Sequence, residues 1–314
     1  MPKRIRLGVS IAVALLATIL PVSCNRIPGA GRGDSAVLVC IPNPGDAHRR
    51  FSLQVSRLSN GAFTRTRQLL ETENCISVPR LSPDGTHVAF AMSASPDCSD
   101  NNDIFVIPTS GGVPVNLTHH PARDSKPSWS PDGKRIAFYS SREPSGIYTM
   151  GSDGSNVARL PTGSTSYETD PAWSPDGTQI AFVSEVQVTL SPGRTTRLPE
   201  IFVVSVDGSY RRRVTDNLTE ESMPTWSPDG KSLIFLRHWA PTLFPDLPTL
   251  EGYSIGGVEL ASGEEYLVRE PPKGNSYEYL SWSETRHEVL ATVASRDRMC
   301  QYLLPCCEAC APQV

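Results

Sequence analysis

The sequence predicts an all-β protein, a six-bladed β-propeller whose blades each have four strands. The string Ser-Pro-Asp-Gly occurs four times in the 314 residues, beginning at Ser82, Ser130, Ser174 and Ser227. A repeat period in the forties is typical of propeller blades. Proline (28) and glycine (23) are plentiful, and no long apolar run with helical period follows the N-terminus. Many short strands joined by tight turns are therefore expected.

Each repeat contains the same succession of elements. A short apolar strand is predicted directly after the turn, at residues 88–90, 136–138, 180–182 and 233–235. A second strand follows after a loop of variable length, at residues 104–106, 147–149 and 201–203. A glycine-containing turn and a closing strand end the unit, and one strand leads into it. Four strands are the number in a propeller blade.

The Ser-Pro-Asp-Gly segment is interpreted as a turn and not as a reactive site. Proline presets φ at the first central position, aspartate tolerates the second, and glycine takes the positive φ that ends the turn. Tryptophan precedes three of the four copies, at Trp129, Trp173 and Trp226. These side chains are expected on the innermost strands, packed between neighbouring blades. The turns are expected on the face opposite the functional site.

The blade count depends on the two flanks. Segments 36–40 and 51–55 are interpreted as strands of an early, diverged blade, and 280–283 begins a degenerate last copy. This count gives six blades and leaves seven open. Residues 36–40 are expected to complete the sheet of the last blade, which would bring Cys40 near Cys300. The propeller is predicted over residues 35–304, with a Cys-rich tail at 305–314.

The N-terminus has the pattern of an export signal. A basic start is followed by an apolar run, too short and wrongly flanked for a comfortable spanning helix, and by a small-residue exit at residues 1–24. Cys24 resembles the lipid-modified cysteine of bacterial lipoproteins, and ordinary cleavage nearby is the alternative. A flexible tether is predicted at residues 25–34. The protein is expected outside the cytoplasm, in the periplasm or on the outer cell surface, held by a lipid anchor.

The remaining cysteines are expected to form disulfides, as exported chains favour. The sequence does not fix their connectivity; the candidates are Cys40, Cys300, Cys75, Cys98, Cys307 and Cys310, with a link between Cys75 and Cys98 and a disulfide in the tail through Cys307 and Cys310 among the pairings considered. The Cys307-x-x-Cys310 spacing would also suit a zinc half-site, but no second half-site accompanies it. Basic and acidic side chains are nearly balanced, 29 against 33, so a polyanionic partner such as nucleic acid is not expected.

The repeat pattern P-x-W-S-P-D-G-x-x-I-A-F, followed by I-Y, D-G-S and L-T, resembles that of the TolB-like six-bladed propeller family. The likeness covers roughly residues 80–225 and implies the propeller fold. It does not fix activity, because such repeats occur in the Tol-Pal component, in propeller domains of peptidases and in sugar lyases. The α/β domain that precedes the propeller of TolB is expected to be missing, because only a short tether separates Cys24 from the first predicted strand.

Three acids recur three residues before the proline of each P-x-W-S: Asp124, Glu168 and Glu221. At the entry to the innermost strands they are expected to ring one mouth of the central channel. Such an electronegative collar could attract a cation or a basic peptide group, and capping of local backbone amides is the alternative. Long loops would add partner contacts through Arg194, Arg197 and Trp239.

A catalytic site is harder to find in the sequence. His119 and His120, with Asp124 nearby, are weak candidates for a divalent metal site, since imidazole and carboxylate suit transition metals. His87, His238 and His287 would have to converge from other blades. No G-x-S-x-G nucleophile elbow occurs.

The functional prediction is a monomeric, non-catalytic exported propeller without a cofactor, which binds an envelope protein or peptide at its channel mouth and adjoining loops. A metal-dependent propeller enzyme of the lyase or glycan-processing type, requiring a divalent cation, is one alternative. A structural envelope protein is the other.

Overall fold

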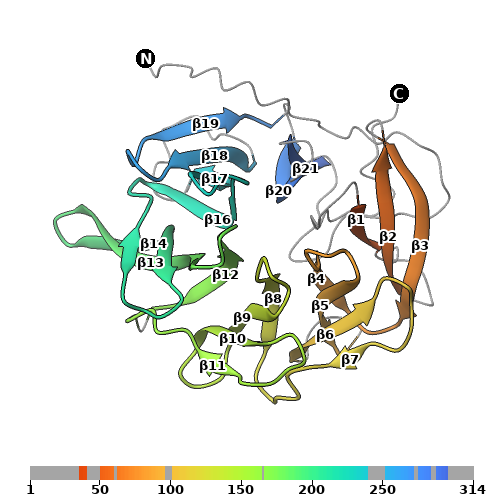
Figure 1. The fold of residues 1–314 in the computed structure, drawn as a ribbon. Coiled ribbons are helices and arrows are strands. Elements are labelled where there is room, and N and C mark those ends of the chain that lie inside the picture. Colours follow the sequence, from red (N-terminus) through yellow and green to blue (C-terminus); the bar gives the residue numbers. More distant parts are fainter. Residues whose placement is uncertain are drawn as a thin grey trace.

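The computed structural model describes residues 35–40, 50–59, 62–95, 101–164, 166–239, 252–271, 275–283 and 288–295. These residues form antiparallel sheets arranged around a centre (Figure 1). Within these ranges no helix is long and apolar enough to span a membrane.

Four of the sheets have four strands, each in chain order from the inside of the ring outward. The first comprises β4 (Ile76–Leu81), β5 (His87–Ser93), β6 (Asn102–Pro108) and β7 (Val115–Asn116). The second comprises β8 (Asp124–Trp129), β9 (Arg135–Ser140), β10 (Gly146–Gly151) and β11 (Ala158–Arg159). The third comprises β12 (Glu168–Trp173), β13 (Gln179–Ser191), β14 (Arg194–Ser205) and β15 (Arg211–Arg213). The fourth comprises β16 (Thr219–Trp226), β17 (Ser232–Trp239), β18 (Ser254–Glu259) and β19 (Glu265–Arg269).

The prediction of six four-stranded blades is wrong, although the all-β class is confirmed. In the described residues the N-terminal sheet has three strands, β1 (Ser35–Cys40), β2 (Phe51–Ser59) and β3 (Ala62–Thr72). The C-terminal sheet has two, β20 (Asn275–Ser283) and β21 (Glu288–Ser295). The clear repeats thus gave complete blades, and the two diverged flanks did not.

The expected pairing of the first strand with the last blade is also wrong. β1 is antiparallel to β2, with Ser35 opposite Arg57 and Cys40 opposite Ser52, and it belongs to the N-terminal sheet. The physical reason is local: β2 follows β1 closely in the chain and offers it an antiparallel partner at once.

The Ser-Pro-Asp-Gly segments are turns between the first and second strands, as predicted. In the copy after β8, the Ser130 hydroxyl donates to Asp132 Oδ1 at 2.6 Å, and the Lys134 amide donates to the same oxygen at 3.0 Å. Gly133 has φ of 70°, the left-handed region that favours glycine. These hydrogen bonds, the one from Ser130 foremost, lower the pKa of Asp132. The acid of the motif is therefore occupied with holding its own turn.

The hydrophobic core lies between neighbouring blades. One cluster combines Ala137 and Ile147 of one blade with Trp173 and Phe182 of the next. The Trp226 indole donates to the Ala172 carbonyl at 3.0 Å, and the Trp129 indole donates to the Arg80 carbonyl at 3.1 Å. Both bonds join innermost strands of adjacent blades. The predicted structural role of these tryptophans is confirmed.

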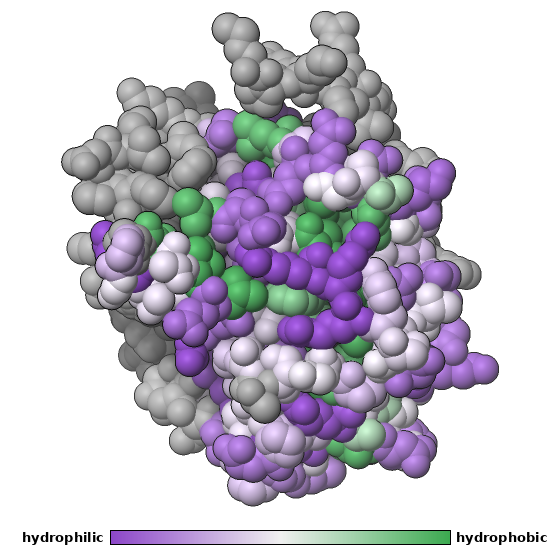
Figure 2. Space-filling model, turned by 90° about the vertical axis from the view of Figure 1, so that its left-hand side faces the viewer, coloured by the Kyte–Doolittle hydropathy of each residue, from purple (hydrophilic) through white to green (hydrophobic). Residues whose placement is uncertain are grey.

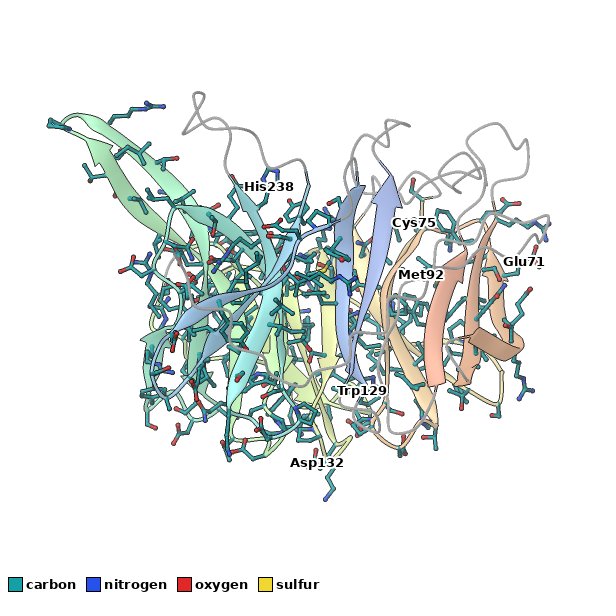
Figure 3. The ribbon with its side chains drawn as sticks, turned by 90° about the horizontal axis from the view of Figure 1, so that it is seen from above. Glu71, Cys75, Met92, Trp129, Asp132 and His238 are labelled. Carbon is teal, nitrogen blue, oxygen red and sulfur yellow. The ribbon has the colours of Figure 1, made fainter. Side chains whose placement is uncertain are left out.

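The two faces of the ring differ. The turn at Asp132 lies on one face, whereas His238, Cys75 and Met92 lie toward the other (Figure 3). Because β4, β8, β12 and β16 begin on the second face, we call it the mouth face.

Candidate functional site

A β-bulge shapes the innermost strand of each four-stranded blade at the residue before proline. Register shifts in the pairing with the second strand mark the bulge in all four blades. The residue before proline has a positive φ in each case: Val78 (47°), Lys126 (56°), Asp170 (53°) and Met223 (52°). This conformation is strained for residues with bulky side chains. Bulges that recur at one position re-aim side chains and are features of the design of a fold.

Two of the bulge residues carry opposite charges and meet. Lys126 Nζ lies 2.7 Å from Asp170 Oδ1, which joins the innermost strands of adjacent blades. Met223 lines a cavity of about 190 Å³ at the turn side of the channel. The cavity wall also includes the tryptophans and prolines of the repeats, among them Trp129, Trp173, Trp226, Pro131, Pro175 and Pro228.

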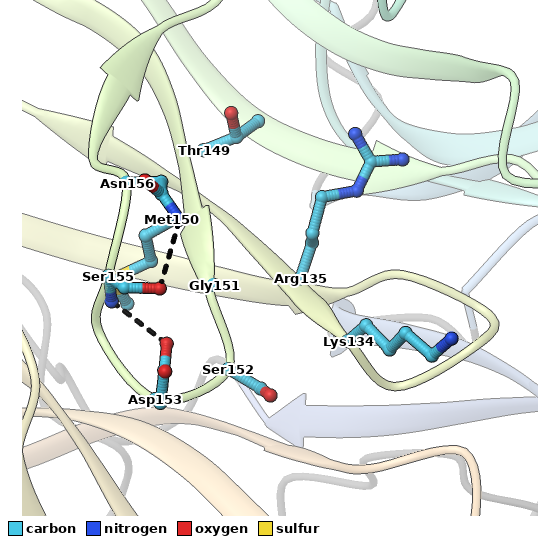
Figure 4. Close-up of a pocket in the computed structure, with 9 residues that line it drawn as sticks. All are labelled: Lys134, Arg135, Thr149, Met150, Gly151, Ser152, Asp153, Ser155 and Asn156. Atoms are coloured by element: carbon cyan, nitrogen blue, oxygen red, sulfur yellow. Dashed lines mark hydrogen bonds between the residues drawn. The ribbon is translucent and has the colours of Figure 1, made fainter.

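A larger recess, of about 390 Å³, lies beside β9 and β10 and includes Lys134, Arg135 and the Ser152–Asn156 turn (Figure 4). Its polar groups already serve the turn: the Ser155 amide donates to Asp153 Oδ1 at 3.0 Å, and Asn156 donates to the Ser155 hydroxyl. Arg135 stacks on the Trp173 ring at 4.5 Å. We interpret this recess as a surface feature of the blade.

The three acids predicted to ring the mouth are buried beneath it. Asp124, Glu168 and Glu221 are 0%, 0% and 1% exposed. Each faces an arginine, which lies at 2.6 Å (Arg142), 3.9 Å (Arg159) or 3.8 Å (Arg237). They do not form an exposed collar. The reason is that arginine and polar side chains from neighbouring segments pack against each carboxyl group. Whether these residues take part in partner binding stays a prediction.

Burial raises the pKa of all three carboxyl groups, because the charged form loses its hydration. The effect is largest at Glu221, whose pKa rises to about 8, and the negative charge of Glu200 adds to it. Burial also raises the pKa of Glu200, although Thr215 and Arg213 oppose the shift.

The contacts of Thr215 explain how the two glutamates share one interface between blades. Its hydroxyl lies 2.7 Å from Glu200 Oε2 and 2.7 Å from Glu221 Oε2, and it accepts the Ile201 amide hydrogen at 2.9 Å. A hydroxyl has one hydrogen to donate, so it can satisfy only one of the two carboxylates. The other carboxyl group must supply a proton of its own. Of the two, Glu200 is paired with Arg213 at 2.8 Å, so we place this proton on Glu221.

The same arrangement recurs in part at other blade interfaces. Thr118 donates to Asp103 at 2.8 Å and also lowers the pKa of Asp124. At the next interface, glycine replaces the first acid, because Gly146 precedes Ile147 where Glu200 precedes Ile201. In β4 and in the C-terminal sheet, Ile76 and Tyr277 replace the second acid, and both are buried.

Sequence reasoning missed several members of these clusters: Glu200, Thr215, Asp103, Thr118 and the arginine partners. An available signal was an acid followed by isoleucine in the third strand of the blade, Asp103-Ile104 in β6 and Glu200-Ile201 in β14, with threonine two residues after the closing strand. This signal alternates with glycine at Gly146, so it is weaker than the turn motif.

The histidines do not converge. His120 accepts the Ala122 amide hydrogen through Nδ1 at 3.0 Å, and His87 Nδ1 contacts Thr86 at 2.8 Å on the turn face. His238 lies against Tyr253 with ring centroids 4.9 Å apart. Over the described part of the chain, no three His, Cys, Asp or Glu side chains are grouped closely enough to hold a metal ion. His287 lies outside the described residues.

The predicted loop contacts fall on two elements. Arg194 and Arg197 belong to β14, and Arg197 is 73% exposed and lies 3.6 Å from Glu185. Trp239 ends β17, where its backbone pairs with Thr219. A pair of tyrosines in contact, Tyr139 and Tyr167 at 5.5 Å, adds aromatic surface near the mouth face.

The described residues test only a part of the cysteine predictions. Cys75 is buried and disulfide-bonded. Its expected partner Cys98 lies outside the described residues, as do Cys24, Cys300, Cys307 and Cys310, and for Cys40 only the backbone is described. The individual pairings and the lipid attachment stay predictions.

Comparison with known proteins shows that the chain is similar to proteins with TolB-type propeller repeats. A family model described as the TolB beta propeller domain matches residues 54–191. The chain is 29% identical over 191 residues to the uncharacterized peptidase YuxL of Bacillus subtilis (strain 168), covering 51% of this chain and 29% of YuxL. It is 27% identical over 197 residues to the Tol-Pal system protein TolB of Francisella tularensis subsp. mediasiatica (strain FSC147), covering 62% of this chain and 41% of that protein.

Among solved structures, the putative TolB of Agrobacterium tumefaciens is similar with a TM-score of 0.61 and 22% identity, covering 87% of this chain and 90% of that one. At this identity the likeness shows the fold alone. The chain spans less than half the length of the two curated relatives.

Proposed function

We propose that this chain, which is similar to TolB-like β-propellers, is an exported binding protein that holds a protein or peptide partner on its mouth face. The observation that carries this proposal is the chemistry of that face. Aromatic rings, the Lys126–Asp170 ion pair and the partly exposed Arg142 and Arg237 lie near the starts of the innermost strands, and such mixtures suit protein recognition.

Two aromatic pairs provide apolar contact area with polar tips. Tyr167, which is 45% exposed, lies against Tyr139 with the rings tilted by 57°, and Tyr253 lies against His238 with the rings tilted by 39°. Burial, and then the negative charges of Glu220 and Asp170, raise the pKa of Tyr253, so its hydroxyl remains a hydrogen-bond donor. Tyrosines with this character are typical anchors of interfaces.

The buried acids would act from below. Asp124 and Glu221 hold Arg142 and Arg237, whose side chains are 14% and 16% exposed. Under this proposal the carboxylates are positioning residues, and the arginines and tyrosines meet the partner.

The cellular setting is part of the proposal. The N-terminal pattern of residues 1–24 supports export, and Cys24 supports a lipid anchor at the envelope. One aligned relative is named as a protein of the Tol-Pal system, which agrees with a partner in the cell envelope.

Crosslinking in intact cells tests the function. The anchored protein should capture a discrete envelope protein, and Tyr167→Ala should reduce the yield severalfold. Lys134→Ala, an exposed change on the turn face, is the matched control and should leave the yield unchanged. Equal capture by both variants would contradict the mouth face as the binding surface. Stoichiometric manganese, zinc or nickel in purified protein would instead favour the metal-dependent enzyme.

A further inference from the structure

One hairpin extends far beyond the propeller. β13 has 13 residues and β14 has 12, whereas the corresponding β9 and β10 have 6 each. The two long strands stay paired from Gln179 with Ser205 to Ser191 with Arg194. We call residues 185–198 the ribbon. It projects away from the ring in Figures 1 and 3. The side from which it projects is largely hydrophilic, with small separate hydrophobic groups (Figure 2).

The tip of the ribbon is a tight turn of Pro192 and Gly193, and Gly193 has φ of 79°. Proline followed by a glycine of positive φ fits a type II turn. Pro192 and Gly193 therefore favour a regular hairpin at this point over an irregular loop.

Both edges of the ribbon lack a neighbouring strand among the described residues. β12 pairs with β13 only up to Glu168 opposite Ser184, followed by the Glu185 amide, which donates to the Tyr167 carbonyl at 3.2 Å. β15 pairs with β14 only at residues 202–204.

The direction of each backbone group follows from the ladder. In an antiparallel pair, residues alternate between pointing toward one neighbour and toward the other. Since the amide of Glu185 points toward β12, those of Gln187 and Thr189 point the same way, where the described chain has no strand. These two residues present a free amide and a free carbonyl each.

The two edges are not equivalent. On β14 the outward positions include Pro199, which has no amide hydrogen to donate and interrupts a ladder. On β13 the outward line runs without proline and continues the line of β12 directly beyond Tyr167. The β13 edge is therefore the better template for an added strand.

Charge indicates what could be added. The charged side chains of the ribbon are Glu185, Arg194 and Arg197, and both arginines are exposed. Arg197 lies 3.6 Å from Glu185, and the ribbon carries a net positive charge. Ribbon residues Gln187 and Thr189 are also exposed and carry no charge. An extended segment with acidic side chains would complement this surface.

We propose that the β13 edge of the ribbon binds an extended, acidic segment of a partner protein as an additional β-strand. This inference rests on the proposed function and names the chemistry of the partner. The segment would pair with Gln187 and Thr189 and would pass beside Tyr167 on the mouth face.

The test uses the purified mature protein and a labelled synthetic peptide of alternating valine and glutamate, with a lysine-for-glutamate peptide as control. Thr189→Pro removes a donor from the β13 edge without removing a bond between β13 and β14, and should weaken binding about tenfold. Thr195→Pro makes the matched change on the β14 edge and should have little effect. Arg194→Glu with Arg197→Glu should also weaken binding about tenfold. Unchanged melting temperatures would confirm that each variant is folded.

Equal loss in both proline variants, or equal binding of the two peptides, would overturn the proposal. Undetectable binding of the acidic peptide to wild-type protein would overturn it too. The mouth face is tested separately by Tyr167→Ala in cells. If Tyr167→Ala reduces capture but Thr189→Pro does not, the proposed function stands and the strand addition is wrong. If Thr189→Pro reduces peptide binding but Tyr167→Ala does not reduce capture, the strand addition stands and the mouth face is wrong as the binding surface.

Discussion

The proton that we place on Glu221, beside Thr215, makes the free energy of unfolding fall as the pH rises. Folded Glu221 has a pKa of about 8, whereas an unfolded glutamate has one of about 4.3. Between these values the folded state holds a proton that the unfolded state releases. Because the folded state then binds more protons, raising the pH lowers the free energy of unfolding. Below about pH 4 both states are protonated, so the contribution is fully present there and no longer changes with pH.

The magnitude follows from the same difference. Each pH unit within the window contributes about 1.4 kcal/mol, so raising the pH from 6 to 8 should destabilise the wild type by about 2 kcal/mol through Glu221. Glu221→Gln removes this dependence. A glutamine can donate to Thr215 and accept from Asn217, which lies 2.6 Å from Glu221 Oε1. It therefore imitates the protonated acid.

Urea denaturation at pH 6, 7 and 8 measures the effect. The difference in free energy of unfolding between Glu221→Gln and wild type should grow in favour of the variant as the pH rises. Glu264→Gln, an exposed change in the same blade, should keep the wild-type pH dependence. The reasoning is refuted if Glu221→Gln loses stability with pH as steeply as the wild type does.

Three further predictions concern the scaffold. Gly146→Ala should destabilise the protein by about 1–3 kcal/mol, because the backbone φ is +148° and an added Cβ would lie 3.0 Å from Glu168 Oε2. Gly163→Ala is the control, since an added Cβ there meets no atom. Thermal denaturation should show a smaller loss of stability for Gly163→Ala than for Gly146→Ala. Ser130→Ala should lower the free energy of unfolding by roughly 1 kcal/mol through loss of its bond to Asp132, and no change in urea denaturation would contradict the turn's structural role. A double-mutant cycle of Lys126→Met and Asp170→Asn should give a coupling of about 1 kcal/mol in low salt, and a coupling of zero would show that the ion pair contributes nothing.

The sequence predicted the structure of the clear repeats correctly, and it did not predict the number of strands in the two diverged flanks. The turn at Ser130–Gly133 and the inter-blade tryptophans follow from residues that recur in register, so local chemistry was enough. The flanking blades were miscounted because strand number there depends on which strand finds a partner, and β1 paired with its neighbour β2.

The position of the three acids along the chain was predicted correctly, but their depth in the structure was not. The spacing of Asp124, Glu168 and Glu221 placed them at the entry to the innermost strands, which the structure confirms. Exposure depends on loops from other strands, and the distant partners Arg142, Arg159 and Arg237 carry no motif. A one-dimensional pattern cannot show that a neighbouring loop covers an acid.

The bulges before proline separate the pairing of a strand from the choice of side chain at one of its positions. Since the residue before each proline sits outside the regular ladder, its side chain is not needed for the pairing of its blade. Valine, lysine, aspartate and methionine occupy this one position in the four complete blades. The side chain at this position can therefore change from blade to blade while the fold of the ring stays the same.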